Sequence, residues 1–300
     1  MSVNRKPKVT VCVVTYNQED FIAKCLQSII EQETDFEFEI IVGDDSSKDG
    51  TADIILDFAK RYPNLIKPII RTINVGAGEN FIDIHRSATG EYIAHVDGDD
   101  YWLPTKLQKQ VDFLDNNKKC NIVWTRSLYY NGDKTLADCL SDDKLFVKKF
   151  YRPDIIKYIS IGTNSSHMYR SICKLTDYPE FDVVDYYKNV VTVGDGYGSF
   201  VNDEPLTVYR VGVGVSSSGC GIVKLMFKSM TAFKQMYPQD KKNLFAPSLL
   251  MFYSSMKRKR FILAAKFLSL ALACFSVKGG GRLKNDMRIY KMFVVPKFNL

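Results

Sequence analysis

Short apolar segments alternate with amphipathic helical segments over the first 116 residues. Segments rich in β-branched residues predict strands buried on both faces, at residues 9–15, 38–43, 69–71 and 92–96. Apolar positions at helical spacing predict helices at residues 21–30, 51–61, 80–88 and 104–116. Strand and helix alternate in steps of roughly thirty residues, which predicts an α/β fold with a mostly parallel central sheet.

Two residues mark expected helix starts. Asn17 is a good capping residue, so we expect it to cap the helix at 21–30. Pro104 suits the first position of a helix, so the helix after the fourth strand is expected to begin there.

The second half of the chain is less regular. It predicts strands at residues 121–130 and 206–211, with a polar segment of uncertain form at 162–170. From about residue 219 the pattern becomes helical and basic. We therefore expect a main domain over residues 1–218 and a basic helical region over residues 219–300.

A polar segment follows each of the four predicted strands. These segments are Thr15-Tyr16-Asn17, Asp44-Asp45, residues 74–80 and residues 97–100. Loops at the carboxyl ends of parallel strands gather at one edge of the sheet and bind ligands there. The sequence therefore predicts a binding site formed by all four segments.

The segment Asp97-Gly98-Asp99-Asp100 carries the strongest chemical signal. Three carboxylates within four residues repel one another unless a cation or a proton joins them. Hard oxygen ligands suit Mn²⁺ or Mg²⁺, which complete their coordination with phosphate oxygens and water. The alternative is an acidic surface turn at the start of a helix.

The two earlier polar segments fit a nucleotide but also fit ordinary turns. A carboxylate at Asp44 or Asp45 can accept the N3–H of uracil, and Tyr16 can stack on the base. Asp and Ser are equally common in turns, and Tyr16 stands where a helix is expected to start. Gly76-Ala77-Gly78 lacks the third glycine of the dinucleotide fingerprint and follows the third strand, which excludes an NAD domain.

Four segments together resemble the family 2 glycosyltransferases with the GT-A fold, in particular bacterial enzymes of O-antigen and capsule synthesis. They are VVTYNQEDF, EIIVGDDSSKDGT, NVGAGENF and ATGEYIAHVDGDDYW. The resemblance is strong over residues 8–116, which would form the nucleotide-sugar half, and thinner over residues 117–218, which would form the acceptor half.

The resemblance implies a role for each matching position. Thr15, Tyr16 and Asp45 would hold the uracil, with Asp44 supporting the turn and Asn17 beside them. Asp97 would meet the ribose or the metal ion. Asp99 would ligate Mn²⁺ or Mg²⁺, with Asp100 as a further acidic group at the metal.

The resemblance also implies a carboxylate base well downstream, before a helix. Asp195 in TVGDGYGSF is the best match, with Asp203 and Glu204 in reserve. An acidic turn between glycines is the alternative at Asp195. The chain departs from the family at Gly212, where the segment that usually reads YRxH has no histidine.

The reaction implied by the resemblance is inverting transfer of a sugar from a nucleotide-sugar, a UDP-sugar, to a saccharide acceptor. The acceptor would be lipid-linked and the pathway would build a bacterial surface polysaccharide. The missing histidine leaves a catalytically weak nucleotide-sugar-binding module as an alternative. A nucleotidyltransferase is a second alternative, although the first strand is not followed by the Gly-rich loop with Lys or Arg that such enzymes carry.

The charge of the chain is concentrated near its end. The net charge is +7, but residues 221–300 hold 16 Lys or Arg against Asp240 and Asp286, a net charge of +14. The remaining residues are therefore acidic overall. Such an asymmetry indicates an anionic partner for the basic region, and no feature indicates a nucleic acid.

The basic region has a candidate membrane-binding segment. Lys257-Arg258-Lys259-Arg260 precedes an apolar run over residues 261–277 that Lys266 interrupts. The run is short for a spanning helix and its lysine would be costly in a bilayer, so we expect docking on an anionic membrane surface, at the inner face of the cytoplasmic membrane. A helical pair packed on the main domain is the equal alternative, and a single-pass anchor is a weaker one.

The cysteines and histidines exclude other classes of site. The seven cysteines are single, without a CxxC pair, which predicts reduced thiols in a cytoplasmic protein. The beginning of the chain lacks the pattern of a signal peptide. The three histidines are too dispersed for zinc, and His95 lies within a predicted buried strand, where a hydrogen-bonded core histidine is expected.

Overall fold

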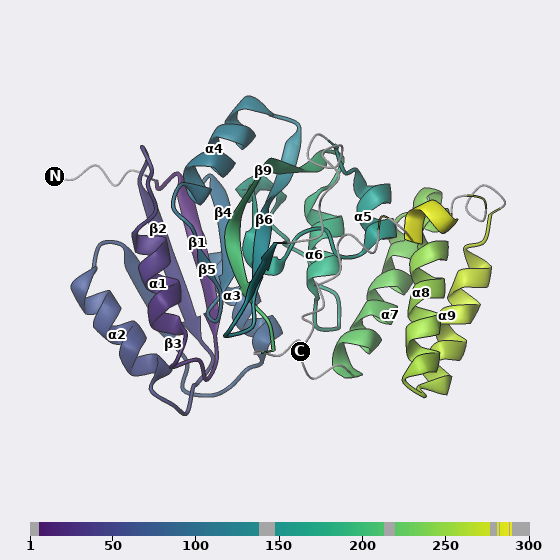
Figure 1. Ribbon diagram of the computed structural model, residues 1–300, viewed down its shortest axis with the longest axis horizontal. Coiled ribbons are helices and arrows are strands. Elements are labelled where there is room, and N and C mark those ends of the chain that lie inside the picture. Colours follow the sequence, from purple (N-terminus) through teal and green to yellow (C-terminus); the bar gives the residue numbers. More distant parts are fainter. Residues whose placement is uncertain are drawn as a thin grey trace.

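A computed structural model describes residues 6–137, 148–212 and 220–276, together with 281, 283–287 and 289. Its centre is a nine-stranded sheet in the order β3-β2-β1-β4-β8-β6-β9-β5, with β7 beside β6. The strands are β1 (Val9–Thr15), β2 (Phe38–Asp44), β3 (Ile66–Ile70), β4 (Tyr92–Asp97), β5 (Tyr101–Trp102), β6 (Cys120–Tyr130), β7 (Thr135–Ala137), β8 (His167–Arg170) and β9 (Tyr197–Arg210). Figure 1 shows this sheet between helical layers.

The helices cover both faces of the sheet. They are α1 (Ile22–Ile30), α2 (Thr51–Arg61), α3 (Ala77–Ser87), α4 (Lys106–Asn116), α5 (Arg152–Tyr158), α6 (Asp185–Thr192), α7 (Cys220–Met236), α8 (Phe245–Lys257) and α9 (Phe261–Ala273). Because neighbouring residues of a strand point to opposite faces, Val11 packs in the core with α1, α2 and α4, whereas Cys12 packs in the core with α3, α5 and α6.

The direction of the strands decides where a site can form. β3, β2, β1 and β4 are parallel neighbours, and β8 is antiparallel to β4. β6 is antiparallel to β8 and parallel to β9, so β6 and β9 run in the same direction as β4. The carboxyl ends of β1, β2, β4 and β9 therefore lie at one edge of the sheet. The mixed α/β fold with a mostly parallel sheet is the one that the sequence predicts.

The expected elements are largely confirmed, with differences at helix starts. The strand at 9–15 and the helix at 51–61 have the predicted bounds. α4 begins at Lys106, later than Pro104, because Thr105 adopts a left-handed backbone with φ of 70°. The predicted cap at Asn17 is wrong: α1 begins five residues later, and Asn17 Oδ1 instead accepts a hydrogen bond from the Lys48 N–H at 2.8 Å.

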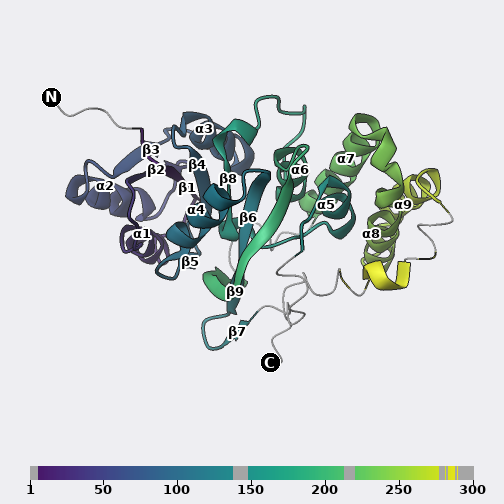
Figure 2. The same cartoon turned by 90° about the horizontal axis from the view of Figure 1, so that it is seen from above.

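One side of the helical group α7–α9 packs against the rest of the molecule. Met230, Phe233 and Phe267 belong to the same apolar cluster as Trp124 of β6, so α7–α9 share a continuous core with the sheet. Figure 2 shows α7, α8 and α9 together at one end of the molecule. Within the described ranges, no helix has the length and apolar character needed to cross a membrane.

Candidate active site

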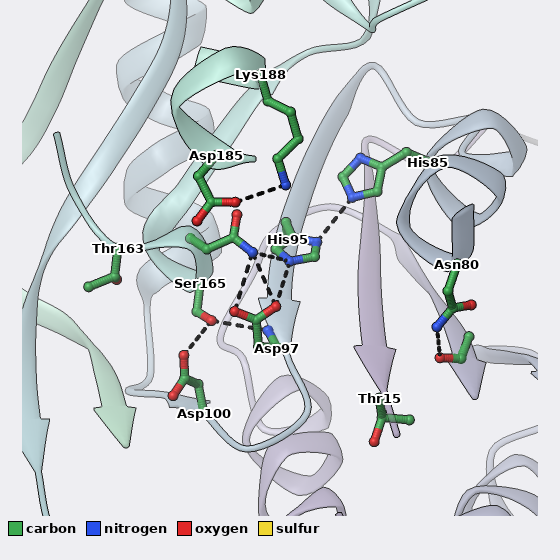
Figure 3. A network of polar contacts seen from close by, with 12 residues as sticks. Thr15, Asn80, His85, His95, Asp97, Asp100, Thr163, Ser165, Asp185 and Lys188 are labelled. Carbon is green, nitrogen blue, oxygen red and sulfur yellow. Dashed lines mark hydrogen bonds and ion pairs between the residues drawn. The ribbon is translucent and has the colours of Figure 1, made fainter. Parts of the chain in front are cut away.

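The carboxyl edge of the sheet brings together the segments that the sequence predicts. Thr15 at the end of β1 lies opposite Asp44 at the end of β2. On the other side of β1, Val14 lies opposite Asp97 at the end of β4. Figure 3 shows Thr15, Asp97 and Asp100 at this edge. The parallel register alone therefore places the first, second and fourth polar segments side by side.

The first segment combines an anchored residue with an exposed ring. Thr15 is buried, and its hydroxyl donates to Gln18 Oε1 at 2.7 Å. Tyr16 is exposed, with 41% of its surface accessible. Asn17 has a positive φ of 51° and links the loop to Ser47, whose Oγ accepts a hydrogen bond from the Asn17 N–H at 2.9 Å. The segment leaves the ring of Tyr16 available for stacking.

The two carboxylates after β2 hold two different loops. Asp44 is buried and accepts hydrogen bonds from the N–H and hydroxyl of Ser47, so it closes its own turn. Asp45 is also buried: its Oδ1 accepts from the Val75 N–H at 2.8 Å and its Oδ2 from the Gly76 N–H at 2.9 Å. Asp45 therefore joins the second polar segment to the third.

Asp97 is held by hydrogen bonds from two elements. Its Oδ1 lies 3.0 Å from Nε2 of His95, two residues earlier on β4. The Asn164 amide donates to both of its oxygens, at 3.1 and 3.2 Å. Burial opposes ionisation, but the hydrogen bond with His95, the charge of Lys188 and the Asn164 hydrogen bond hold the pKa of Asp97 below its ordinary value. The group is a carboxylate at neutral pH.

A buried chain of rings continues from Asp97 into the core. Nδ1 of His95 lies 3.0 Å from Nε2 of His85, and Nδ1 of His85 lies 2.7 Å from the hydroxyl of Tyr169. Burial lowers the pKa of both histidines, so both imidazoles are neutral. The expectation that His95 is a hydrogen-bonded core histidine is confirmed (Figure 3).

Asp99 is an acid in an unfavourable place. It is 8% exposed, and burial, followed by the nearby charge of Asp97, raises the pKa of Asp99 to about 6. Carboxylates in this situation are stabilised by a cation. A cation beside Asp99 would relieve this repulsion.

Both carboxylate oxygens of Asp100 accept hydrogen bonds within the protein. Its Oδ2 accepts a hydrogen bond from the Ser165 hydroxyl at 2.5 Å, and its Oδ1 accepts from the Arg210 N–H at 2.8 Å. Burial, followed by repulsion from Asp99, raises the pKa of Asp100 far above its ordinary value. Asp100 thus joins the loop after β4 to β9, and its expected place at the metal stays a prediction.

The carboxylates of Asp97 and Asp99 fit a hard divalent cation. Asp97 and Asp99 offer carboxylate oxygens at the carboxyl edge, and the repulsion between them is the feature that a cation would relieve. Among the residues that the structure describes, no group of three or more His, Cys, Asp or Glu is placed to hold a metal ion. Mg²⁺ and Mn²⁺ often bind through one or two carboxylates and take the rest of their shell from phosphate and water, so the donor set suits them.

The structure does not bring Asp195 to this site. Asp195 lies in the turn before Tyr197, and Tyr197 pairs with Cys120, the first residue of β6. Because β6 and β9 run in the same direction as β4, this turn lies at the opposite edge of the sheet. The Asp195 side chain is fully exposed and pairs with Arg152 at 3.4 Å. Asp195 therefore lies at the edge of the sheet opposite to Asp97.

Of the two other candidates for the base, Asp203 and Glu204, the structure describes the side chain of Glu204. The exposed Glu204 forms an ion pair with Lys109 of α4. The side chain of Asp203 lies outside the described part of the structure. The Glu204 carboxylate is therefore engaged by Lys109.

A carboxylate that the sequence analysis missed does lie at the site. Asp185 is the first residue of α6, and its exposed carboxylate forms an ion pair with Lys188 Nζ at 3.0 Å. Lys188 also lies 3.5 Å from the ring centroid of Phe81 and acts electrostatically on Asp97. Figure 3 shows Asp185 and Lys188 beside the Asp97 group.

Two further missed residues come from the polar segment of uncertain form. Asn164 and Ser165 form a short helical turn before β8, and Ser165 Oγ accepts a hydrogen bond from the Asp97 N–H at 3.0 Å. The available signal was the polar run of residues 163–166 before an apolar segment. Its target could not be known before the antiparallel pairing of β8 with β4 was known.

The position that lacks the family histidine has an unusual backbone. Gly212 adopts φ of +91°, a left-handed conformation that side chains other than glycine avoid. The nearby Arg210 keeps a contact with the acidic segment, because its Nε donates to the Asp99 carbonyl at 2.9 Å. A histidine at position 212 would be strained in this conformation.

Comparison with known sequences shows a family. The sequence profile of Glycosyl transferase family 2 matches residues 10–169, more than half of the chain. WfaP of Escherichia coli, described as a UDP-Glc:alpha-D-GlcNAc-diphosphoundecaprenol beta-1,3-glucosyltransferase, is 29% identical over 216 residues, 70% of this chain and 80% of WfaP. The chain spans about half the length of the mycobacterial relatives that it matches at 37% identity, with 46% of each covered.

Solved structures show the same fold. Residues 1–349 of TarS from S. aureus in complex with UDP-GlcNAc give a TM-score of 0.66 at 20% identity, over 95% of this chain and 89% of that one. The mannosyltransferase PcManGT from Pyrobaculum calidifontis, in complex with GDP-Man and Mn²⁺, gives 0.58 at 19% identity, over 95% and 81%. These likenesses confirm the expected GT-A fold.

Proposed function

Because the chain belongs to glycosyl transferase family 2, we propose that it is an inverting glycosyltransferase that moves a sugar from a UDP-sugar to a saccharide acceptor. The observation that carries this proposal is that Asp185, at the start of α6, lies beside the group of Asp97, the last residue of β4, two residues before Asp99 (Figure 3). Asp97 and Asp99 suit the donor diphosphate, and Asp185 suits the acceptor hydroxyl. An acidic surface turn gives no reason for Asp185 to lie there.

The uridine end of the donor is assigned to the first two polar segments. Tyr16 has an exposed ring for stacking, and Thr15 and Asn17 shape the loop around it. Asp45 uses one lone pair of each oxygen for the loop at Val75 and Gly76. A carboxylate has about four acceptor sites, so Asp45 keeps capacity for the uracil N3–H.

The diphosphate is assigned to Asp97 and Asp99. When bound between these carboxylates and the donor, Mn²⁺ or Mg²⁺ would neutralise charge on the departing diphosphate as a Lewis acid. Asn164 and His95 hold the Asp97 carboxylate in one orientation, so it is ready for ribose or metal without rearrangement.

Asp185 is proposed as the general base in place of Asp195. It accepts the proton of the attacking acceptor hydroxyl as the new C–O bond forms and the bond to the diphosphate breaks. Lys188 Nζ pairs with the Asp185 carboxylate at 3.0 Å and so holds it in position beside the Asp97 group. Attack on the face opposite the departing diphosphate inverts the anomeric carbon, so an α-linked UDP-sugar gives a β-glycoside.

The acceptor is proposed to be a saccharide on a lipid diphosphate, used in surface polysaccharide synthesis. WfaP, which the chain matches over 70% of its length, is named for an acceptor of this kind. The protein would then work at the inner face of the cytoplasmic membrane, where such an acceptor is held.

A panel of nucleotide-sugars tests the proposal. We expect UDP-sugars to raise the melting temperature more than GDP- or ADP-sugars, and only when Mn²⁺ or Mg²⁺ is present. Asp99→Ala should remove the metal-dependent part of this stabilisation. Equal stabilisation by all nucleotides, or full stabilisation of Asp99→Ala, would contradict the assigned donor site.

A further inference from the structure

The turn between α8 and α9 is basic and carries exposed apolar side chains. We call residues 253–262 the hairpin tip. Within it, Tyr253, Phe261 and Ile262 are 65%, 63% and 80% exposed. Lys257 and Lys259 of the basic run are exposed as well. The sequence has no Asp or Glu between residues 241 and 285, so the α8–α9 hairpin itself carries only basic charges.

The exposure is specific to one side of the helical pair. The inner side of α9 is buried through Ala264, Phe267, Leu270 and Ala271, which pack against the rest of the molecule. The hairpin tip stands outside that contact. Packing on the main domain therefore explains the inner side of the helices and leaves Phe261 and Ile262 unexplained.

The hairpin tip lies on the same side of the molecule as the active site. β9 ends at Arg210, at the carboxyl edge of the sheet, and α7 begins ten residues later at Cys220. In Figure 1, α7 leads away from this edge, α8 returns to it and α9 leads away again. The α8–α9 turn and the carboxyl ends of the parallel strands therefore both lie at the lower side of the view.

We propose that the hairpin tip docks on an anionic membrane surface and turns the carboxyl edge of the sheet toward it. Phe261 and Ile262 enter the interface between headgroups and acyl chains, while Lys257 and Lys259 contact anionic headgroups. The combination favours a lipid surface over a soluble polyanion, which would use the cations and leave the apolar side chains in water. The inference deepens the proposed function, because it places the site where a lipid-linked acceptor lies.

Sedimentation of the full chain with vesicles tests the docking. Phosphatidylcholine vesicles with and without phosphatidylglycerol are compared over a salt series. We expect binding only to the anionic vesicles, and binding that weakens steeply as salt rises. Each cation near such a surface contributes about 1 kcal/mol, a factor of about five, so Lys257→Gln with Lys259→Gln should weaken binding about 25-fold.

The chain offers a matched charge control at the other end of the helices. Lys241 and Lys242 are exposed, and Lys241 acts electrostatically on Cys274, just beyond the far end of α9. Lys241→Gln with Lys242→Gln makes the same change in net charge and should alter vesicle binding less than threefold. Equal loss in the two double variants would overturn the proposal, because net charge alone would then explain binding.

A second pair of variants tests the apolar contact. Ile262→Asn should weaken binding about tenfold, since burying such a side chain is worth about 1.5 kcal/mol or more. Leu272 is 67% exposed on α9, about 15 Å further along the helix. Leu272→Asn should leave binding unchanged. An equal effect would mean that the helix lies flat, and no effect of Ile262→Asn would indicate a soluble polyanion as the partner; either result overturns tip docking.

The test is independent of catalysis. Sedimentation needs no donor, and the hairpin-tip variants should keep the UDP-dependent rise in melting temperature. Normal UDP binding without vesicle binding would overturn the docking alone. Vesicle binding without UDP binding would contradict the proposed function alone.

Discussion

Nε2 of His95 lies 3.0 Å from Oδ1 of Asp97, and both residues belong to the same strand, β4. The strand therefore supplies an acidic residue of the site and the group that supports it from behind. His95 is in turn 3.0 Å from His85, so the orientation of Asp97 depends on a network within the core. Substitutions in that network should therefore change the orientation of the Asp97 carboxylate, although the substituted residues do not contact a ligand.

The buried histidines predict acid sensitivity. Burial lowers the pKa of His85, His95 and His167 in the folded state, whereas the unfolded value is about 6.5. Below pH 6.5 the unfolded chain binds protons that the folded chain does not, so these groups reduce stability as pH falls. Each histidine contributes up to about 1.4 kcal/mol per pH unit.

His167→Phe measures one of these contributions. Its free energy of unfolding in urea should fall less than that of the wild type between pH 6.5 and 5.5, by up to about 1.4 kcal/mol. The comparison removes the contribution of the acids, which is common to both proteins. An equal fall in the two proteins would mean that the pKa of His167 is the same in the folded and unfolded states, which would contradict the lowered pKa.

Asp99→Asn should separate stability from metal binding. The pKa of Asp99 is raised to about 6, so in the metal-free protein its ionisation lowers stability as pH rises from about 4 to 6, and the loss persists at pH 7. Without metal at pH 7, the variant should be more stable by about 2 kcal/mol. Mn²⁺ with UDP should stabilise the wild type and not the variant. A variant that is less stable at pH 7 without metal would contradict the strained environment assigned to Asp99.

Asp45→Asn should reduce both the stability of the loop at Val75 and Gly76 and the affinity for UDP. The carboxylate accepts the N–H groups of Val75 and Gly76, and an amide can accept only through one oxygen. We expect a loss of about 1–3 kcal/mol of stability and a weaker preference for UDP over GDP and ADP. Calorimetry with Mn²⁺ measures the preference; an unchanged preference would restrict Asp45 to its structural role.

Asp185→Asn and Asp195→Asn form a matched pair. Asp185→Asn should reduce transfer by about 100-fold or more while UDP affinity stays the same, because a general base contributes at that level. Asp195→Asn should keep transfer within about twofold, since its carboxylate pairs with Arg152 at the opposite edge. The reverse order of effects would restore Asp195 as the base.

The sequence predicted the parallel half of the fold because its signals are local. The run at residues 9–15 is buried on both faces and is followed by polar residues, and the register of Val14 with Asp97 follows from parallel pairing. The elements that complete the site come from distant segments. Asn164 and Asp185 meet Asp97 through the pairing of β8 with β4 and the packing of α6, which no local pattern encodes.

The position of Asp195 was hidden from the sequence for the same reason. The motif TVGDGYGSF has a suitable composition, but the direction of β9 decides at which edge it lies. Asp185 was overlooked although it starts a segment with Tyr186 and Val190 at helical spacing. The composition of each segment makes Asp185 and Asp195 equally suitable as a base. Only the fold shows which of the two lies near Asp97.

Metal-dependent release of nucleoside diphosphate from a panel of nucleotide-sugars, measured without acceptor, tests the central claim most directly. Binding alone releases nothing, so the assay separates an enzyme from a nucleotide-sugar-binding module. We predict that the wild type and Asp195→Asn release UDP from at least one UDP-sugar when Mn²⁺ or Mg²⁺ is present, and that Asp99→Ala does not. Release from no sugar, or equal release by Asp99→Ala, would contradict the account.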